Sequence, residues 1–192
     1  RVLFRSSPSE ASRFRAHVAR LNYLGQDSPE LQFPAKELSK RMSQPRLVDW
    51  ARLKKAVRFL IGRRAVVWQF AWQEEVGSVR VYTDSDWAGD RSSRKSTSGG
   101  VIKLGSHCIK TWGSTQGAVA LSSAEAEFYA MVEGVVKEKG LAQVAEELGL
   151  EVVEKWVELG TDSSAAKSFV ARRGLGKMRH IEVRNMWLQD RS

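Results

Sequence analysis

Two aspartates follow strand-like segments of this sequence, and a serine comes directly after each of them. Asp84 closes the segment VRVYT, and Asp162 closes the segment KWVELGT. In α/β sheets, ligands gather at the carboxyl ends of parallel strands, so both acids stand where a binding site is expected. Each aspartate also has a structural interpretation, because its side chain can start a turn or cap the next helix. For either residue alone, the structural interpretation is favoured.

A third acid stands on the helix that the sequence predicts between the two aspartates. Glu125 lies three residues after Ser122, which is the spacing of a capping box, so its expected role is structural. Glu127 has no such role and lies at the edge of the apolar stripe, on a flank shared with Ala130 and Gly134. These small residues allow the helix to approach a strand closely. A carboxylate in that position needs a cation to face, because burial of an unpaired charge is unfavourable.

Asp84, Glu127 and Asp162 are therefore predicted to meet at one point. Three like charges repel one another unless a cation lies between them. Ligation by oxygen alone, without a nearby histidine or cysteine, selects Mg²⁺ or Mn²⁺. Two such ions, about 3.5–4 Å apart, form the clamp that cleaves phosphodiesters by in-line displacement. The predicted cofactor is accordingly a pair of Mg²⁺ or Mn²⁺ ions.

The charge of the chain favours a polyanionic partner. Its 192 residues include 31 lysines and arginines and 22 aspartates and glutamates, which gives a net charge of +9. Such a surplus favours nucleic acid, with an anionic membrane surface second. The single cysteine, Cys108, excludes an internal disulfide and a multi-cysteine zinc site, and the three histidines show no zinc-binding spacing. With no long apolar run and no signal-peptide pattern, we expect a soluble intracellular protein without a membrane partner.

The elements that would hold the three acids lie in the second half of the chain. The residue pattern predicts strands at 65–72, 79–84, 98–106, 108–114 and 154–162. It predicts helices at 121–150, broken near Gly140, and at 163–174, and a last amphipathic piece at 180–189. Adjacent strands followed by helix, strand and helix predict an α/β fold with a mixed sheet and flanking helices.

Residues 10–63 have a different pattern and are predicted to be helical. The segment 28–42 is expected to be interrupted at Pro34, and the segment 47–64 is the clearest helix, ended by Gly62. Its predicted apolar stripe consists of Leu47, Trp50, Leu53, Val57 and Leu60. Its other face either meets solvent or lies along a phosphate backbone, and carries Arg52, Lys54, Lys55 and Arg58. Two domains are predicted, at residues 1–73 and 74–192.

Four segments of the chain match one known family. They are YTDSDWAGDRSSRKSTSGG, ALSSAEAEFYA, GTDSSAA and GLGKMRHIEV. Together, in this order, they resemble the ribonuclease H domain of Ty1/copia-type LTR retrotransposon polyproteins. The resemblance covers residues 79 to about 190. Residues 1–73 are similar to the mainly helical segment that connects the reverse transcriptase to that domain.

The resemblance implies a ribonuclease H fold and hydrolysis of the RNA strand of RNA–DNA hybrids during reverse transcription. It implies that Asp84, Glu127 and Asp162 are the catalytic metal ligands. Asp86 and Asp90 are expected to be turn and loop acids, with Asp86 as the reserve candidate. The implied partners are an RNA–DNA hybrid and the reverse transcriptase portion of the same polyprotein. The acid order Asp, Glu, Asp separates the chain from integrases and transposases of similar fold, which have the order Asp, Asp, Glu.

The family also has a fourth carboxylate, on a helix that follows a fifth strand. These elements would come after Ser192, so the ribonuclease H-like domain is expected to be truncated, with its last strand and helix missing. Glu182 does not match the position of the fourth ligand. The rival function is a degenerate module that binds nucleic acid or supports a polymerase without catalysis. A third interpretation is an enzyme of DNA strand transfer.

Two basic stretches are predicted to hold the hybrid. The first lies between two predicted strands and consists of Arg91, Arg94, Lys95, Ser96, Thr97 and Ser98, which can pair or hydrogen-bond with phosphates. The alternative interpretation of this stretch is an ordinary charged hairpin loop. The second offers Arg172, Arg173, Lys177, Arg179 and His180. Ser123 is a candidate for contact with a ribose 2′-hydroxyl, whereas Ser122 is expected to cap its helix. Trp87 and Trp112 are expected to pack in the core rather than to stack on bases.

Overall fold

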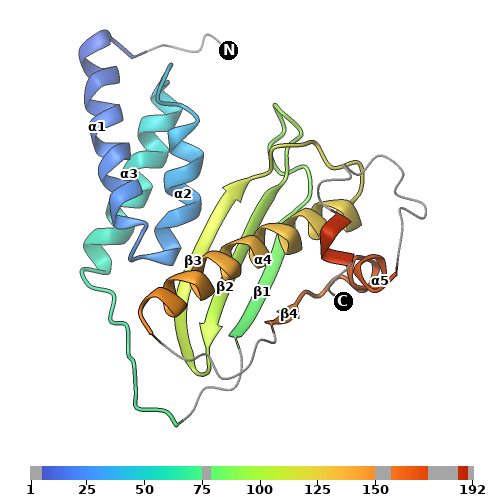
Figure 1. Ribbon diagram of the computed structural model, residues 1–192. Coiled ribbons are helices and arrows are strands. Elements are labelled where there is room, and N and C mark those ends of the chain that lie inside the picture. Colours follow the sequence, from blue (N-terminus) through green and yellow to red (C-terminus); the bar gives the residue numbers. More distant parts are fainter. Residues whose placement is uncertain (1–5, 75–78, 150–156, 173–185, 190–192) are drawn as a thin grey trace. The chain divides into compact units, whose positions relative to one another are not determined.

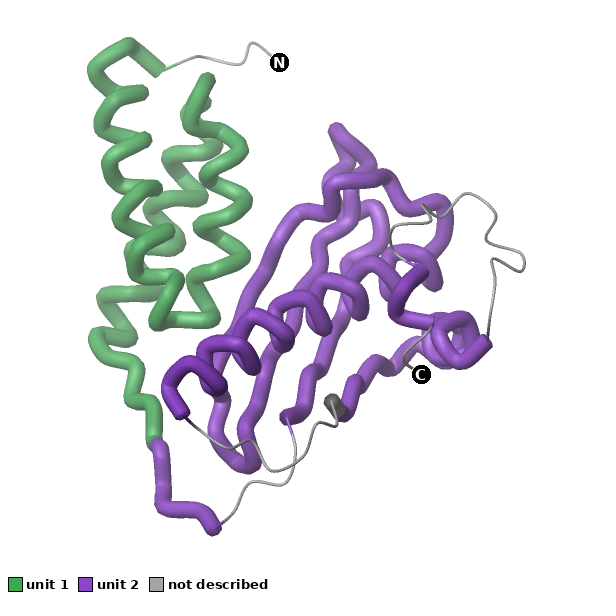
Figure 2. The backbone as a smooth tube through the Cα atoms, in the orientation of Figure 1, with its two compact units in different colours: residues 1–69 green, residues 70–192 purple. Residues whose placement is uncertain are grey.

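The chain forms two compact units, residues 1–69 and residues 70–192 (Figure 2). The computed structural model describes residues 6–74, 79–149, 157–172 and 186–189. The division between the units lies close to the domain boundary that the sequence predicts after residue 73. The assignment of the first unit as a connection segment stays a prediction.

Unit 1 consists of three helices, α1 (Pro8–Leu24), α2 (Pro29–Ser39) and α3 (Leu47–Gly62) (Figure 1). A capping box begins α1, because the Ser7 hydroxyl accepts a hydrogen bond from the Glu10 amide and the Glu10 carboxylate accepts one from the Ser7 amide. The three helices share one apolar core, which consists of Phe14, Val18, Leu21, Leu31, Ala35, Leu38, Leu53 and Ala56.

Two details of the predicted helices in unit 1 are wrong. α2 runs through Pro34 without interruption, because residues on both sides of the proline pack into the core and offset one missing backbone hydrogen bond. In α3, Leu47 and Val57 are exposed rather than buried. Asp49 is buried instead, at 2% exposure, because its carboxylate accepts a hydrogen bond of 3.0 Å from the Arg46 amide at the helix start.

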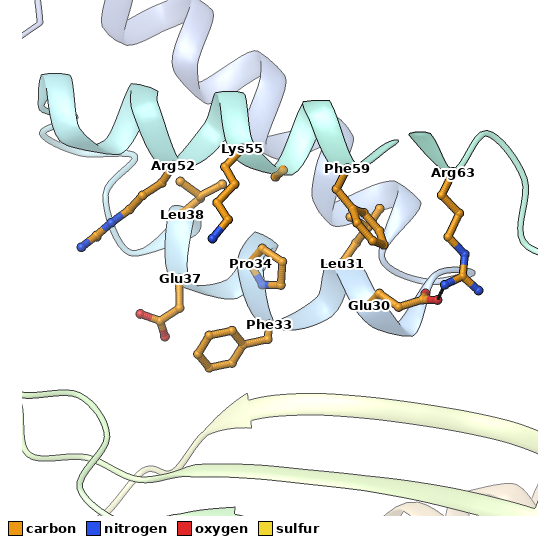
Figure 3. Close-up of a pocket in the computed structure, with 11 residues that line it drawn as sticks. Glu30, Leu31, Phe33, Pro34, Glu37, Leu38, Arg52, Lys55, Phe59 and Arg63 are labelled. Atoms are coloured by element: carbon orange, nitrogen blue, oxygen red, sulfur yellow. Dashed lines mark ion pairs between the residues drawn. The ribbon is translucent and has the colours of Figure 1, made fainter. Parts of the chain in front are cut away.

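A pocket of about 620 Å³ lies between α2 and α3 of unit 1 (Figure 3). Its wall includes exposed aromatic surface from Phe59. Two of the basic residues considered for phosphate contact, Arg52 and Lys55, also line it. The other two, Lys54 and Arg58, are exposed to solvent. The pocket belongs to unit 1, whereas all three predicted metal ligands belong to unit 2.

Unit 2 is built on a four-stranded sheet in the order β3-β2-β1-β4 (Figure 1). The strands are β1 (Val79–Asp86), β2 (Thr97–Leu104), β3 (His107–Thr115) and β4 (Val157–Gly160). β2 is antiparallel to both β1 and β3, and β4 is parallel to β1. The predicted α/β fold with a mixed sheet is therefore confirmed.

Helix α4 (Ser123–Glu147) lies across one face of this sheet (Figure 1). It also packs on α5 (Ser164–Val170) through an apolar cluster that includes Phe128 and Phe169. The predicted break of α4 near Gly140 is wrong. The helix continues because Leu141, the next residue, packs against the cluster of Val79, Val81, Ile102 and Trp112 on the sheet.

The predicted strand at 65–72 is also wrong, because residues 63–73 have no regular secondary structure. The chain here contacts the sheet through side chains rather than through a backbone ladder. Gln73 donates a hydrogen bond of 3.1 Å to the Leu104 carbonyl and accepts one of 2.9 Å from the Ser106 amide. Of the predicted amphipathic piece at 180–189, only residues 186–189 belong to the described part of the chain, and they form a short 3₁₀ turn.

The two tryptophans singled out in the sequence have different environments. Trp112 is 9% exposed and packs against Gly100, so its predicted place in the core is confirmed. Trp87 is 49% exposed, and the expectation that it packs inward is wrong. Its indole nitrogen donates a hydrogen bond of 3.1 Å to the Ala120 carbonyl, which satisfies the polar end of the ring at the surface. In the described ranges, no helix has the length and apolar character that crossing a membrane requires.

Candidate metal centre

Asp84 and Asp162 have equivalent positions relative to the parallel pairing of β1 with β4. The last paired residues of β1 and β4 are Tyr82 and Gly160, and each aspartate follows two residues later in its own chain segment. The sequence prediction that both acids come to the carboxyl end of parallel strands agrees with this register.

Glu127 lies near the start of α4. The helix can lie close to β1 because Gly134, two turns further on, has no side chain that would meet Val81 and Thr83. Glu127 itself is 8% exposed, whereas Asp84 and Asp162 are exposed. A mostly buried carboxylate therefore stands behind two carboxylates that face solvent.

The three acids converge. One carboxylate oxygen from each of Asp84, Glu127 and Asp162 lies within 4.8 Å of the other two. Two ligand oxygens on opposite sides of one Mg²⁺ stand about 4.2 Å apart, so a small side-chain rotation would let these acids share an ion. The set offers only oxygen donors, which suits Mg²⁺ or Mn²⁺. The predicted convergence is confirmed, and the donor set fits the predicted metals.

Hydrogen bonds hold the Glu127 carboxylate in place. Its Oε1 atom accepts bonds from the Ser85 amide at 3.0 Å and from the Ser85 hydroxyl at 2.6 Å. Its Oε2 atom accepts a bond from the Thr161 hydroxyl at 3.3 Å. The Ser85 amide also donates to Asp84 Oδ1 at 2.8 Å. The sequence interpretation missed Ser85 and Thr161, although each lies directly beside one of the predicted aspartates.

Glu125, two residues before Glu127, has the structural role that its spacing predicts. It is 1% exposed, its amide donates to the Ser122 hydroxyl, and its carboxylate accepts hydrogen bonds from the Leu121 amide and the Tyr129 hydroxyl. The return bond reaches Leu121 rather than the cap residue itself. These contacts occupy Glu125 at the start of α4 and leave Glu127 as the acid of this helix that faces the two aspartates.

The sequence is similar to two retrovirus-related Pol polyproteins of Arabidopsis thaliana. The polyprotein from transposon RE2 is 30% identical over 145 residues, which are 74% of this chain and 10% of the relative. The polyprotein from transposon RE1 is 28% identical over 178 residues, which are 91% of this chain and 12% of the relative. The chain belongs to the retrovirus-related Pol polyproteins of copia-type retrotransposons.

This Pol segment spans about a tenth of the length of those two relatives. A third relative is the secreted RxLR effector protein 161 of Plasmopara viticola, which is 36% identical over 107 residues, or 55% of this chain and 73% of the relative. No family model matches the Pol segment, and no solved structure is significantly similar to it.

Asp86 and Asp90 of the Pol segment lie at the end of β1 and in the loop that follows. Gly89 packs directly over the Asp86 carboxylate, where any side chain at position 89 would overlap it. Asp90 Oδ1 accepts hydrogen bonds from the Ser92 amide at 3.0 Å and the Ser92 hydroxyl at 2.7 Å. Asp90 is therefore a loop acid, as predicted. Asp86 lies outside the group of three converging carboxylates.

The first predicted nucleic-acid stretch needs one correction. Ser96 and Ser98 are completely buried and cannot reach a phosphate. The Ser96 hydroxyl accepts a hydrogen bond from the Ala88 amide, and the Ser98 hydroxyl accepts one from the Gln116 side chain. The alternation of β2 directs Ser98 inward, and Ser96, one residue before this strand, is also 0% exposed, which the polar composition of the stretch does not reveal.

The other members of the stretch remain accessible. Arg91 and Arg94 are exposed, and Lys95 and Thr97 are partly buried. Arg94 has a φ of 58°, in the left-handed region, because the loop turns sharply there.

The remaining nucleic-acid candidates of the Pol segment are divided between described and undescribed residues. Ser123 is exposed at the first position of α4, directly after the cap residue Ser122. Arg172 follows α5 and places its guanidinium 5.1 Å from the centroid of the Phe169 ring. The rest of the second basic stretch lies outside the described residues and comprises Arg173, Lys177, Arg179 and His180. Glu182 also lies outside them.

Proposed function

We propose that this chain hydrolyses the RNA strand of RNA–DNA hybrids during reverse transcription of its retrotransposon. The observation that carries the proposal is the convergence of Asp84, Glu127 and Asp162 within 4.8 Å, in a chain similar to Pol polyproteins. Mg²⁺ or Mn²⁺ is the proposed cofactor, as two ions. The proposed partners are the hybrid and the reverse transcriptase portion of the same polyprotein.

Each of the three acids has its own task in this proposal. Asp84 and Asp162 offer exposed oxygens at the ends of their strand segments, where a phosphodiester backbone has access. Glu127 offers a carboxylate whose orientation is limited by burial and by hydrogen bonds. Bound divalent ions would supply an activated water and stabilise the leaving oxygen of the phosphodiester. The contribution of the protein is to hold the acids in fixed positions and to bind the polyanion.

The loop after β1 is the proposed contact for the nucleic-acid backbone. It begins directly after the strand that carries Asp84, so its cations lie at the same end of the sheet as the acids. Arg91 and Arg94 are exposed there and can pair with phosphates. Ser123 is proposed to meet a ribose 2′-hydroxyl, the group that distinguishes RNA from DNA. Arg172 and Thr97 are retained as further backbone contacts.

The proposal is tested with the full chain and a labelled RNA–DNA hybrid. We expect cleavage of the RNA strand that requires Mg²⁺ or Mn²⁺ and falls by more than about 100-fold in Asp84→Asn, since loss of a residue that only supports a ligand already costs 10–100-fold. The matched control is Asp90→Asn, which removes a carboxylate from the neighbouring loop and leaves the three acids intact.

Other outcomes identify the rival functions. Tight binding of the hybrid without cleavage by the wild-type chain would support a non-catalytic module. Cutting of duplex DNA would point to strand transfer. Cleavage that survives in Asp84→Asn would refute the assignment of the acids.

A further inference from the structure

Hydrogen-bond donors fill the acceptor positions of one carboxylate oxygen of Glu127 completely and those of the other oxygen only in part. Oε1 accepts two hydrogen bonds, both from Ser85, whereas Oε2 accepts one, from Thr161. An ionised carboxylate has about two acceptor positions on each oxygen. Among the hydrogen bonds of the described residues, Oε1 is therefore saturated and Oε2 retains an acceptor position.

The hydroxyl of Thr161 is oriented by a second contact. Its oxygen accepts a hydrogen bond of 3.2 Å from the Ser163 amide, so its own proton remains available to the Glu127 carboxylate. Thr161 is 7% exposed, which keeps competing water away from this bond. The donor to Oε2 therefore comes from the residue directly after β4, whereas both donors to Oε1 come from β1.

Ser85 connects two of the three acids. Its amide lies within hydrogen-bonding distance of both Asp84 Oδ1, at 2.8 Å, and Glu127 Oε1, at 3.0 Å. Ser85 is a strand residue of β1 paired with Ser98 of β2, so its backbone cannot follow a moving side chain. A rigid strand residue thus sets the distance between an exposed carboxylate and a buried one.

We propose that Ser85 and Thr161 are positioning residues that hold the Glu127 carboxylate ready for a divalent cation, with Oε2 as the oxygen that binds it. This inference rests on the metal-dependent function proposed above. The two residues do not bind the ion themselves. They compensate a mostly buried negative charge before the cation arrives, and they leave an acceptor position on Oε2 available to it.

The test measures binding of Mn²⁺ to the full chain without nucleic acid, by calorimetry and by the electron paramagnetic resonance of free Mn²⁺. We expect Ser85→Ala and Thr161→Val to weaken Mn²⁺ binding by about 10–100-fold, the range found when residues behind metal ligands are removed. Ser85→Thr and Thr161→Ser keep the hydroxyl donor and should restore binding to within a few-fold. Circular dichroism detects loss of structure. If Ser85→Ala or Thr161→Val does not fold, the two variants at the other position test the proposal.

Ser114 provides a matched control. Its hydroxyl donates to the Glu133 carboxylate of α4 at 2.6 Å, the same type of contact and the same length as the bond from Ser85 to Glu127. Ser114→Ala should leave Mn²⁺ binding unchanged, because Glu133 is not one of the converging acids.

The results separate the two proposals. Suppose that the wild-type chain binds Mn²⁺ and that the folded Ser85→Ala and Thr161→Val variants bind it equally well. This result would overturn the positioning role and leave the proposed function standing. Wild-type chain that binds no Mn²⁺ would overturn both. A defect that the hydroxyl-retaining variants do not repair would also refute the positioning role, because the hydroxyl would then not be the group that matters.

Discussion

Gly134 of α4 lies against the Thr83 side chain of β1. A Cβ atom at residue 134 would stand 2.6 Å from Thr83 Cγ2 and 3.0 Å from Val81 Cγ1. Both neighbours are branched at Cβ and belong to a central strand, so they have little freedom to move aside. The absence of a side chain at position 134 is therefore what allows α4 to approach β1 and bring Glu127 to the ends of the strands.

Gly134→Ala is expected to destabilise the chain by about 1–3 kcal/mol, the usual cost of adding a methyl group to a filled core. Gly140→Ala in the same helix is the control. Its added Cβ meets nothing within 4 Å, so it should stabilise α4 by about 0.5–1 kcal/mol through helix propensity alone. Urea denaturation followed by circular dichroism measures both free energies of unfolding. Equal effects of the two substitutions would contradict the close contact.

Asp162→Asn is expected to stabilise the chain in the presence of a chelator. The three carboxylates lie within 4.8 Å of one another, and removal of one charge relieves a repulsion of about 1 kcal/mol for each pair exposed to water. The same variant should lose the increase in melting temperature that Mn²⁺ produces in the wild-type chain, because a ligand that binds only the folded state stabilises it. Thermal unfolding with and without Mn²⁺ checks both effects. A lower melting temperature in the chelator would argue against repulsion among the acids.

The exposed arginines of the loop after β1 are expected to set the salt dependence of hybrid binding. The double substitution Arg91→Gln and Arg94→Gln should weaken binding and lower the slope of log K against log salt by about 0.9 for each phosphate that the chain no longer neutralises. Lys110→Gln, an exposed cation in β3, is the control. Fluorescence anisotropy with a labelled hybrid in a chelator gives the affinities. An unchanged slope in the double variant would show that these two arginines face solvent and do not contact phosphates of the hybrid.

Gln73 is expected to stabilise unit 2 although it lies outside every helix and strand. Its side chain bonds to the Leu104 carbonyl, the Ser106 amide and the His107 ring, so it holds both ends of the turn between β2 and β3. Gln73→Ala should cost about 1–3 kcal/mol, because the turn loses its hydrogen bonds to this side chain, and those of Leu104 and His107 are part-buried. Gln143→Ala, which removes an exposed hydrogen bond to Glu147 on α4, should change stability by less than about 0.5 kcal/mol. If the two variants unfold alike, the contact of Gln73 with the turn does not contribute to stability.

The sequence by itself determined the elements and residues whose signals are local. The alternation of residues 79–84 predicted β1, the capping spacing separated Glu125 from Glu127, and the two aspartates at strand ends marked the carboxyl edge of the sheet. These signals depend on neighbours within a few positions, where backbone geometry and side-chain periodicity act directly. The mixed sheet and the convergence of the three acids followed from them.

Only the tertiary structure decided which polar residues face the acids and which are buried. Ser85 meets Glu127 across 42 positions, and Thr161 meets it across 34, so no local pattern reveals either contact. Ser96 and Ser98 look like phosphate ligands by composition but lie inside the unit. Residues 65–72 have the apolar content of a strand but form no strand in the described part of the chain. Each of these outcomes depends on long-range packing, which decides where a hydrogen-bond partner is available and where water is excluded.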